Sequence, residues 1–384
     1  MSISPRTRPT IVRAFRSCRR LLSTSALPPA PPPRGYAHLT TRRLISLRGH
    51  DAPRFLQGLT TQNIPSVDSP SSHPRPQGLY SAFLNASGRV LYDVFIYPDS
   101  RLREQNDLGF LIDVDAREVQ SLARHLKRYK LRAKVTVEVV DDGEAQVWQA
   151  WDDTSPVNFL PNADHVWTVC EDCRSEVMGT RLIASGDRKL DMDADLVDVG
   201  TYEVRRILRG VAEGQSEIIK DSALPLECNM DYMNGIDFRK GCYVGQELTI
   251  RTRHTGVVRK RILPVQLYGS GVAPEILEYR PSSSVVIPPK DTNINRSPGK
   301  GRSVGKWLGG IGNIGLALCR LENMTNIALN NRGIQQSPTD EFMLSWLTEE
   351  GREGGEVRTK AFVPDWLRTR ISSQDTHGEG SPNG

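Results

Sequence analysis

Helical and strand periodicities alternate at short intervals along the chain, and this alternation is the strongest constraint on its fold. Residues 110–140, FLIDVDAREVQSLARHLKRYKLRAKVTVEVV, predict a strand, a helix and a second strand. Val119, Leu122 and Leu126 fall on one helical face, and the valines from 135 to 139 alternate as they do in a strand. No run approaches the roughly 18 consecutive apolar residues of a membrane span. The sequence therefore predicts an α+β fold without a membrane-spanning helix.

The same patterns divide the chain into units. Residues 80–97 predict a hairpin that turns at Asn85–Gly88. Short glycine-rich strands after residue 255 predict a small β-barrel. The predicted organisation is a transit peptide over 1–36, an α+β core over 37–140 and 190–255, a strand-rich part of the second domain over 141–189, a barrel over 256–367 with an insertion at 270–302, and a disordered tail over 368–384.

Basic charge is concentrated at the N-terminus. Residues 1–50 hold ten arginines and no Asp, Glu or Lys, and apolar residues and serines lie between the arginines. This pattern is typical of a mitochondrial transit peptide, whereas a secretory signal needs an apolar core segment. A basic tail without a targeting role is the alternative. We expect a mitochondrial matrix protein.

The rest of the chain is acidic. Removing residues 1–50 leaves 40 Lys and Arg against 45 Asp and Glu, a formal net charge of 40 − 45 = −5. The basic pI therefore belongs to the N-terminal segment and gives no electrostatic argument for a nucleic-acid partner.

The six cysteines show no pairing pattern. They lie at positions 18, 170, 173, 228, 242 and 319. In a reducing matrix disulfides are not expected. Cys170 and Cys173 form a CxxC, but no second pair stands at zinc-finger spacing, which favours a local loop feature over a metal or redox site. The histidines also lack metal-ligand spacing.

One cysteine stands in an unusual context, the stretch FRKGCYVGQELTIRTRHTGVVRKR over residues 238–261. Gly241 favours a tight turn before Cys242. A thiol in the first turn of a following helix has a lowered pKa, and Arg239 and Lys240 add positive charge beside it. Such a thiolate could ligate iron or receive sulfur. A buried, apolar cysteine is the alternative, and the residues alone leave both interpretations open.

The surrounding segment, LPLECNMDYMNGIDFRKGCYVGQELTIRTRHTGVVRKRILPV over residues 224–265, resembles the signature of the YgfZ family. It is most similar to the mitochondrial branch, the iron–sulfur cluster assembly factors related to the glycine-cleavage T-protein. The core KGCYxGQE is specific. Further blocks agree with this resemblance at residues 55–64, 80–97, 202–214, 312–322 and 363–367.

The resemblance implies a fold and a function. The family fold has three domains around a central opening, with an aminomethyltransferase-like, folate-binding-type core and a C-terminal β-barrel. The family supports maturation of [4Fe–4S] proteins in the matrix, such as aconitase and the synthases of lipoate and biotin. A-type iron–sulfur carrier proteins and client apoproteins are the implied partners. Tetrahydrofolate in the opening and a transient iron–sulfur cluster, shared with a carrier, are the implied ligands.

The resemblance also assigns residues. Cys242 is the functional thiol, and its motif neighbours are Lys240, Gly241, Tyr243, Gly245, Gln246 and Glu247. The folate-like cavity is expected at Asp93, Asn229, Asp231 and Arg251. A basic cluster after the motif could meet a folate tail or an acidic partner, or form a solvated face; it comprises Arg251, Arg253, His254, Arg259, Lys260 and Arg261.

Two alternatives remain beside the assembly factor. An aminomethyltransferase needs an acidic residue where Cys242 stands, a second acidic residue where Tyr92 precedes Asp93, and a glutamate where Leu208 stands. These departures argue against amine transfer, so turnover of a small substrate is not expected. A non-catalytic adaptor with a structural Cys242 is the second alternative. Since a [4Fe–4S] cluster normally takes four thiolates, no permanently bound cluster is expected.

Overall fold

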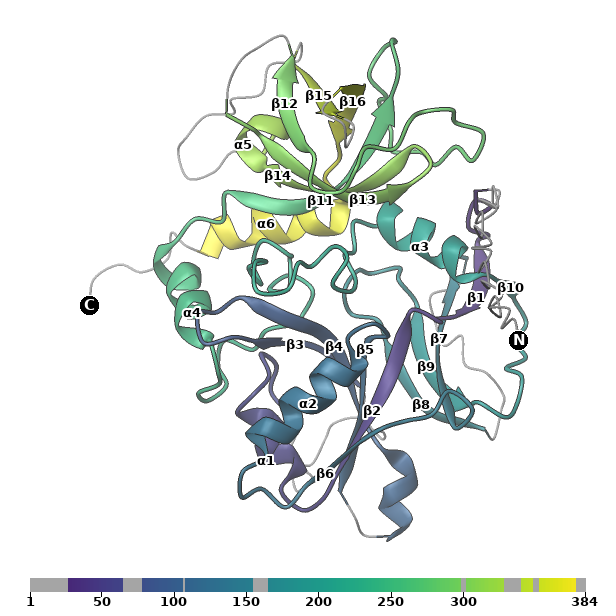
Figure 1. Ribbon diagram of the computed structural model, residues 1–384, viewed down its shortest axis with the longest axis vertical. Coiled ribbons are helices and arrows are strands. Elements are labelled where there is room, and N and C mark those ends of the chain that lie inside the picture. Colours follow the sequence, from purple (N-terminus) through teal and green to yellow (C-terminus); the bar gives the residue numbers. More distant parts are fainter. Residues whose placement is uncertain are drawn as a thin grey trace, which may run out of the picture.

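The computed structural model describes residues 27–64, 78–105, 108–154, 165–297, 302–327, 340–347 and 352–377. Two five-stranded sheets and a closed six-stranded barrel make up this part of the chain (Figure 1). The first 26 residues of the predicted transit peptide lie outside the described residues. No helix in the described ranges is long and apolar enough to cross a bilayer.

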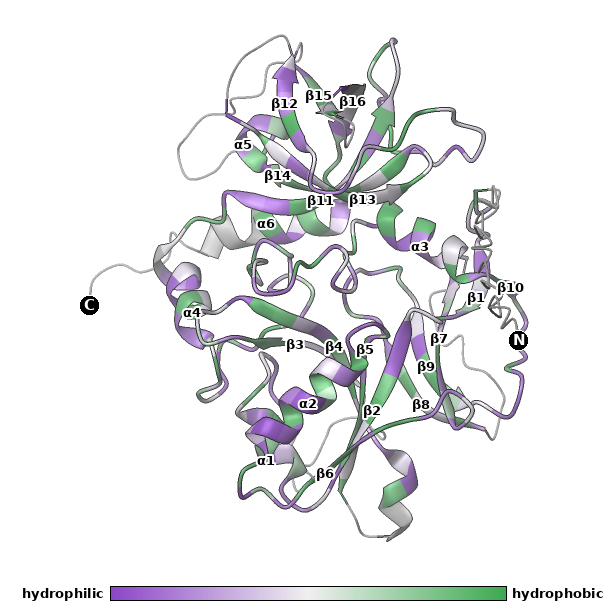
Figure 2. Cartoon of the chain, viewed as in Figure 1, coloured by the Kyte–Doolittle hydropathy of each residue, from purple (hydrophilic) through white to green (hydrophobic). Residues whose placement is uncertain are grey.

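The first sheet has the strand order β3-β4-β5-β2-β6. Its strands are β2 (Arg42–Arg48), β3 (Leu79–Leu84), β4 (Val90–Pro98), β5 (Gly109–Asp115) and β6 (Thr136–Val139). Helices α1 (Ala52–Gln57) and α2 (Val119–Tyr129) pack their apolar sides against it, and Leu56, Leu122 and Leu126 are fully buried there. In Figure 2, α2 carries hydrophobic and hydrophilic residues on different sides. The predicted hairpin and the amphipathic helix are confirmed.

The second sheet has the order β10-β1-β7-β9-β8. Its strands are β1 (Arg34–His38), β7 (Ala145–Asp152), β8 (Val166–Glu171), β9 (Thr180–Ser185) and β10 (Asp195–Val197). The proline run before β1 is attached to the fold: Pro32 O accepts a hydrogen bond from Trp151 Nε1 at 2.9 Å, and Pro28 O accepts one from Tyr279 at 2.8 Å. The folded part therefore begins before residue 36, earlier than the boundary predicted from the sequence.

The barrel closes in the order β11-β14-β13-β12-β15-β16. Its strands are β11 (Lys260–Tyr268), β12 (Asn293–Ser297), β13 (Gly305–Ile311), β14 (Ile314–Arg320), β15 (Glu341–Leu347) and β16 (Glu353–Ala361). The predicted insertion at 270–302 is wrong for residues 293–297, because β12 pairs with both β13 and β15. Ile294 is the strand's one fully buried side chain, so its apolar pattern is too weak to identify it.

The remaining helices connect these units. They are the 3₁₀ helix η1 (Ser100–Gln105), α3 (Val199–Leu208), α4 (Gln246–Thr255), α5 (Leu321–Met324) and α6 (Asp365–His377). Helix α3 contacts both β1 and β14, and so joins the second sheet to the barrel. The disordered tail predicted from residue 368 is wrong as far as residue 377, since α6 continues through it and buries Ile371.

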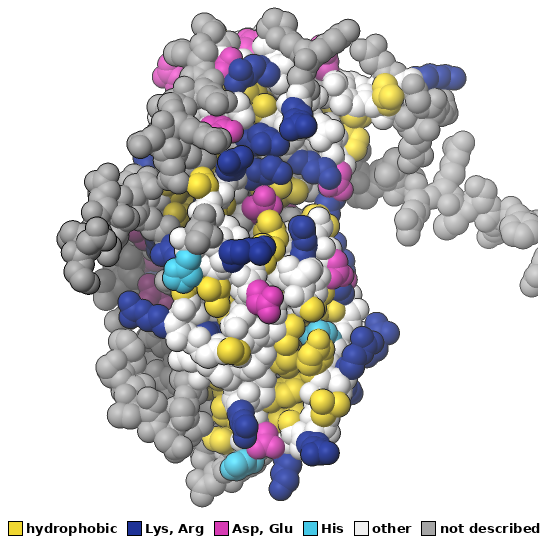
Figure 3. Space-filling view, turned by 90° about the vertical axis from the view of Figure 1, so that its left-hand side faces the viewer, with side chains coloured by type: hydrophobic (Ala, Val, Ile, Leu, Met, Phe, Trp, Pro, Cys, Tyr) yellow, Lys and Arg dark blue, Asp and Glu magenta, His cyan; other side chains and the backbone are white. Residues whose placement is uncertain are grey.

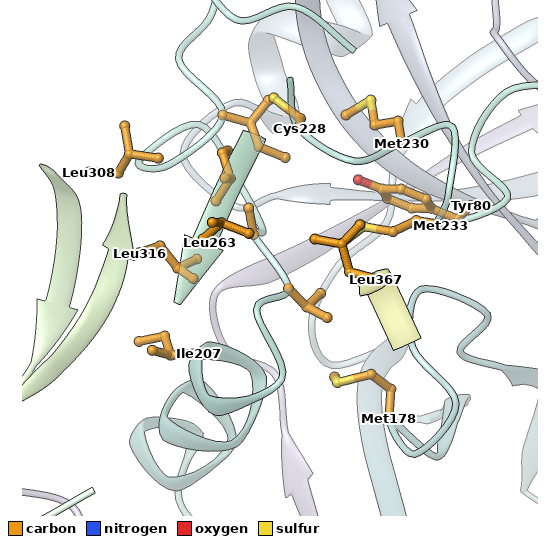
Figure 4. Close-up of a cluster of buried hydrophobic side chains, with 14 of the residues drawn as sticks. Tyr80, Met178, Ile207, Cys228, Met230, Met233, Leu263, Leu308, Leu316 and Leu367 are labelled. Carbon is orange, nitrogen blue, oxygen red and sulfur yellow. The ribbon is translucent and has the colours of Figure 1, made fainter. Parts of the chain in front are cut away.

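A single apolar cluster runs through all three units. Figure 4 shows Leu263 and Leu316 from the barrel, Ile207 from α3 and Leu367 from α6 in this cluster. Met230 lies in the same cluster, in the irregular segment 210–245 that leads to α4. The segment that carries the cysteine motif is therefore anchored in the main core.

Candidate functional site

The motif loop, residues 237–245, presents Cys242 to solvent. The thiol lies three residues before Gly245, which is the N-cap of α4. The sequence pattern suggested that Cys242 lies in the first turn of a helix. This prediction is wrong, because the thiol precedes the helix. Gly241 does not have a positive φ, and an added Cβ would meet nothing within 4 Å, so the expected conformational role of this glycine is also wrong.

Lys240 fixes the loop from its inner side. Its ammonium group donates hydrogen bonds to the carbonyl oxygens of Gln57, Thr60 and Gln62, at 2.9, 2.6 and 2.9 Å. These carbonyls lie at and beyond the C-terminal end of α1, where a cation meets unpaired carbonyl groups and the negative end of the helix dipole. Burial lowers the pKa of Lys240 to about 8. The lysine therefore points into the protein and does not supply the positive charge beside the thiol that the sequence suggested.

Two glycines allow the loop to approach the hairpin of β3 and β4. Gly245 has φ +80°, and a Cβ there would lie 2.3 Å from Asn85 O. Gly88 has φ +79°, and a Cβ there would lie 2.9 Å from Gly245 O. Left-handed backbone and close backbone contact both favour glycine over any other residue. The tight turn predicted at Gly241 therefore occurs at Gly245.

Substitution of the two motif glycines should have opposite outcomes. Gly245→Ala should lower the free energy of unfolding by at least about 1–2 kcal/mol, because the left-handed backbone alone costs that much for a residue with a Cβ. Gly241→Ala should stay within about 0.5 kcal/mol of the wild type. Urea unfolding of both variants measures the difference. Equal destabilisation by the two would contradict this account of the turn.

The other motif residues complete the turn. Gln246 Oε1 accepts a hydrogen bond from the Tyr243 backbone N–H at 3.2 Å. The Tyr243 ring is buried, with the Lys240 ammonium 5.0 Å from its centroid, and burial raises the pKa of Tyr243 to about 12. Glu247 is exposed in the first turn of α4. The motif therefore forms a loop that is held on its inner side and open at Cys242.

The other described cysteines are poor candidates for surface chemistry. Cys170, Cys228 and Cys319 are buried, and Cys173 is partly buried. Burial raises the pKa of each thiol, to about 11 for Cys173. Cys228, the described cysteine nearest to Cys242 in the sequence, packs in the main core (Figure 4). Among the described residues, no group of three or more His, Cys, Asp or Glu side chains could hold a metal ion.

The four residues expected to form a folate-like cavity lie in different environments. Asp93 is fully buried and accepts hydrogen bonds from the Gly214 N–H and the Gln215 side chain. Asn229 and Asp231 both bind the Arg261 guanidinium, at 3.2 and 2.9 Å, whereas Arg251 is exposed on α4. None of the four lines either of the two cavities described below. The pairing of Arg261 with Asp231 also removes Arg261 from the predicted surface cluster.

A buried network of charges lies between the two sheets, and sequence reasoning missed it. Arg42 Nε donates to Asp113 Oδ1 at 2.6 Å, and Arg181 donates to Asp113 Oδ2 at 2.6 Å. Arg174 and Arg181 both bind Glu213 Oε2. The signal was available, because several of these charges stand within otherwise apolar strands, where an unpaired buried charge is not tolerated.

A polar cavity of about 380 Å³ opens beside this network. Arg42 and Glu213 form part of its lining, together with Asp115, Arg117 and Arg206. Arg117 binds Asp115 at 2.7 Å, and Arg206 binds Glu217 at 2.7 Å. These five charges therefore already have partners within the protein.

Comparisons with known proteins agree with the architecture. Residues 259–369 match the family described as CAF17, C-terminal beta-barrel domain. The protein from Neosartorya fischeri described as iron-sulfur cluster assembly factor IBA57 homolog, mitochondrial, is 50% identical, over 91% of this chain and 86% of that protein. The protein of the same description from Pyricularia oryzae is 52% identical, over 88% of this chain and 86% of that protein.

A solved structure is similar in fold. The glycine cleavage system aminomethyltransferase T from Bartonella henselae superposes with a TM-score of 0.57, at 11% sequence identity, over 87% of this chain and 86% of that chain. At this identity the similarity concerns the fold alone. The predicted T-protein-like α+β fold with a C-terminal barrel is confirmed.

Proposed function

Because the chain belongs to the family of mitochondrial iron–sulfur cluster assembly factors that includes the IBA57 homologues, we propose that Cys242 is the residue through which it handles a cluster. Membership of the family makes the protein a mitochondrial iron–sulfur cluster assembly factor, which favours this function over aminomethyl transfer. The observation that carries the role of Cys242 is its position: among the described cysteines it alone is exposed.

The geometry suits a ligand that is supplied to a second molecule. The thiolate is the form of cysteine that binds iron, so the Cys242 proton passes to solvent as the iron–sulfur bond forms. Three carbonyl contacts from Lys240 and the close packing of Gly245 hold the loop in place, so that little entropy is lost when the thiol binds. We propose that cysteines of an A-type carrier supply the remaining ligands of a shared, transient cluster.

The cluster then passes to apoproteins that need a [4Fe–4S] centre. Clients of the aconitase type and of the lipoate and biotin synthase type follow from the family resemblance. Tetrahydrofolate is a separate proposal: the Arg117 side chain lies on the lining of the polar cavity and is 67% exposed, so it can attract the carboxylates of the glutamate tail while it also binds Asp115. Calorimetric titration with tetrahydrofolate tests this proposal. The absence of binding heat at a tenfold excess of ligand over protein would contradict it.

Mixing experiments test the shared cluster directly. The purified protein is added to an A-type carrier loaded with a cluster, and visible circular dichroism and size exclusion follow the complex. A new spectrum and a heteromeric complex are expected with the wild type and with Cys173→Ser, the matched control at a partly buried cysteine. Cys242→Ser should give neither. If it forms the same complex with the same spectrum, Cys242 is not a ligand.

A further inference from the structure

A surface cavity lies beside α4, the helix that follows the motif loop. It has a volume of about 250 Å³, and we call it the α4 pocket. Its apolar lining comes from Leu224, Pro225, Leu226, Leu248, Val257 and Val258. Val257 is 39% exposed, so the apolar lining reaches solvent. A cavity of this size holds one or two apolar side chains and is too small for a cofactor such as a dinucleotide.

Cations stand on the lining of the α4 pocket. Lys260 and Arg320 are directly opposite each other in the antiparallel pairing of β11 with β14, and Arg259 is adjacent and exposed. Like charges opposite each other across two strands destabilise a sheet. Within the described ranges, no ion pair joins Arg259, Lys260 or Arg320 to an acidic side chain. An anionic ligand would remove this repulsion.

Glu227 is the acidic side chain of the pocket. Burial raises the pKa of Glu227, while the positive charges of Lys260, Arg89 and Arg320 lower it. The lining of the pocket therefore carries one carboxylate and three cations, Arg259, Lys260 and Arg320, so its net charge is positive. Figure 3 shows the face that carries α4, with Lys and Arg side chains gathered above its middle and hydrophobic side chains next to them.

A second, independent observation points to a ligand. Thr249 lines the pocket and is 1% exposed, yet its hydroxyl group has no hydrogen-bond partner among the described residues. A buried hydroxyl without a partner costs about 1–3 kcal/mol, so such groups are rare in folded proteins. A ligand with a peptide group or a carboxylate at this position would satisfy it.

We propose that the α4 pocket docks an acidic segment of a partner protein, with one apolar side chain in the pocket and flanking carboxylates on Arg259, Lys260 and Arg320. The apolar lining selects the side chain, the cations select the flanking charges, and the Thr249 hydroxyl bonds the peptide backbone. The purpose of this docking would be to bring a partner's cysteines to Cys242, and in this respect the inference rests on the proposed function.

The position of the pocket fits that purpose. Helix α4 has ten residues, about 15 Å of length at 1.5 Å per residue. Cys242 precedes its N-cap by three residues. An extended chain covers about 3.3 Å per residue, so a partner anchored anywhere along α4 reaches the thiol with fewer than about ten residues.

Peptide selection tests the pocket with no partner chosen in advance. A phage library of random 12-residue peptides is selected on the full-length wild-type protein and, in parallel, on Thr252→Trp, which fills the cavity from α4. The wild type should enrich peptides in which an apolar residue lies within two positions of Asp or Glu. Enrichment of basic peptides, or of the same peptides on both proteins, would overturn the proposal.

The selected peptide is then synthesised and its affinity measured by fluorescence polarisation. Thr252→Trp and Lys260→Glu should each weaken binding at least tenfold. Lys127→Glu, an exposed lysine on α2, should leave it unchanged. Unchanged affinity with Lys260→Glu would overturn the charge argument. Displacement of the peptide by octanoate with no effect of Lys260→Glu would assign the pocket to a small apolar molecule and would also overturn the proposal.

Cys242→Ser separates this inference from the proposed function. The peptide should bind this variant as it binds the wild type, because the thiol does not line the pocket. If Cys242→Ser supports full cluster maturation in cells, the role of the thiol is wrong, and the peptide result still decides whether the pocket is a docking site.

Discussion

Cells in which this protein carries Cys242→Ser should lose matrix aconitase activity to the level of a complete deletion, while the protein itself remains at normal abundance. The thiol is exposed, so replacing its sulfur with oxygen removes no core contact and should change the free energy of unfolding by less than about 0.5 kcal/mol. A hydroxyl group is a far poorer ligand for iron than a thiolate. The expected loss is therefore functional and not structural.

Cys173→Ser provides the matched control and should restore aconitase activity, with glycine-cleavage flux measured in the same extracts. Full rescue by Cys242→Ser would support the adaptor alternative, in which the cysteine only shapes the loop. A normal aconitase activity with reduced glycine cleavage in the deletion strain would contradict the cluster-handling proposal and favour aminomethyl transfer.

Glu213→Gln should cause the largest loss of stability, about 3–5 kcal/mol, because breaking a buried ion network leaves charges without a partner. Glu213 binds Arg174 at 2.7 Å and also contacts Arg181 and the Tyr202 hydroxyl. Both arginine side chains are fully buried and cannot turn to solvent. Thermal and urea unfolding measure the effect, and Glu176→Gln at an exposed site should stay within about 0.5 kcal/mol of the wild type.

The pH dependence has a defined sign. Burial acts to raise the pKa of Glu213, but the positive charges of nearby arginines hold it well below 4.5; these are Arg181, Arg174, Arg42 and Arg206. A carboxyl group with a depressed folded-state pKa stabilises the protein above its unfolded-state pKa and loses that contribution as the pH falls through the folded value. The wild type should therefore lose stability below about pH 4.5 more steeply than Glu213→Gln. Equal slopes would contradict this role of Glu213.

Local elements could be predicted from the sequence because short-range periodicity determines them. The apolar positions of α2, the hairpin at Asn85–Gly88 and most barrel strands follow from residues close together in the chain. Strand β12 could not be predicted in this way. Its assignment depends on hydrogen bonds to β13 and β15 from other parts of the chain, and a polar pentapeptide gives no sign of them.

The candidate site also has features that the sequence predicted and features that it could not predict. The motif identified Cys242 as the residue of interest, and its member Gln246 bonds the turn. The inward direction of Lys240 could not be predicted, since its three carbonyl partners lie about 180 positions away in the sequence. The sequence also could not predict which members of the basic cluster are exposed. Arg261 is buried against Asp231, whereas Arg259 remains exposed.

The sequence by itself determined the family and the α+β class and singled out Cys242 as the candidate, because a specific motif and local periodicity are properties of neighbouring residues. Only the tertiary structure decided that this thiol is exposed, which charges are neutralised in the core and which remain on the surface beside α4. Exposure and ion pairing depend on the distance between segments that are remote in the chain, and these distances are set by packing, which no local pattern encodes.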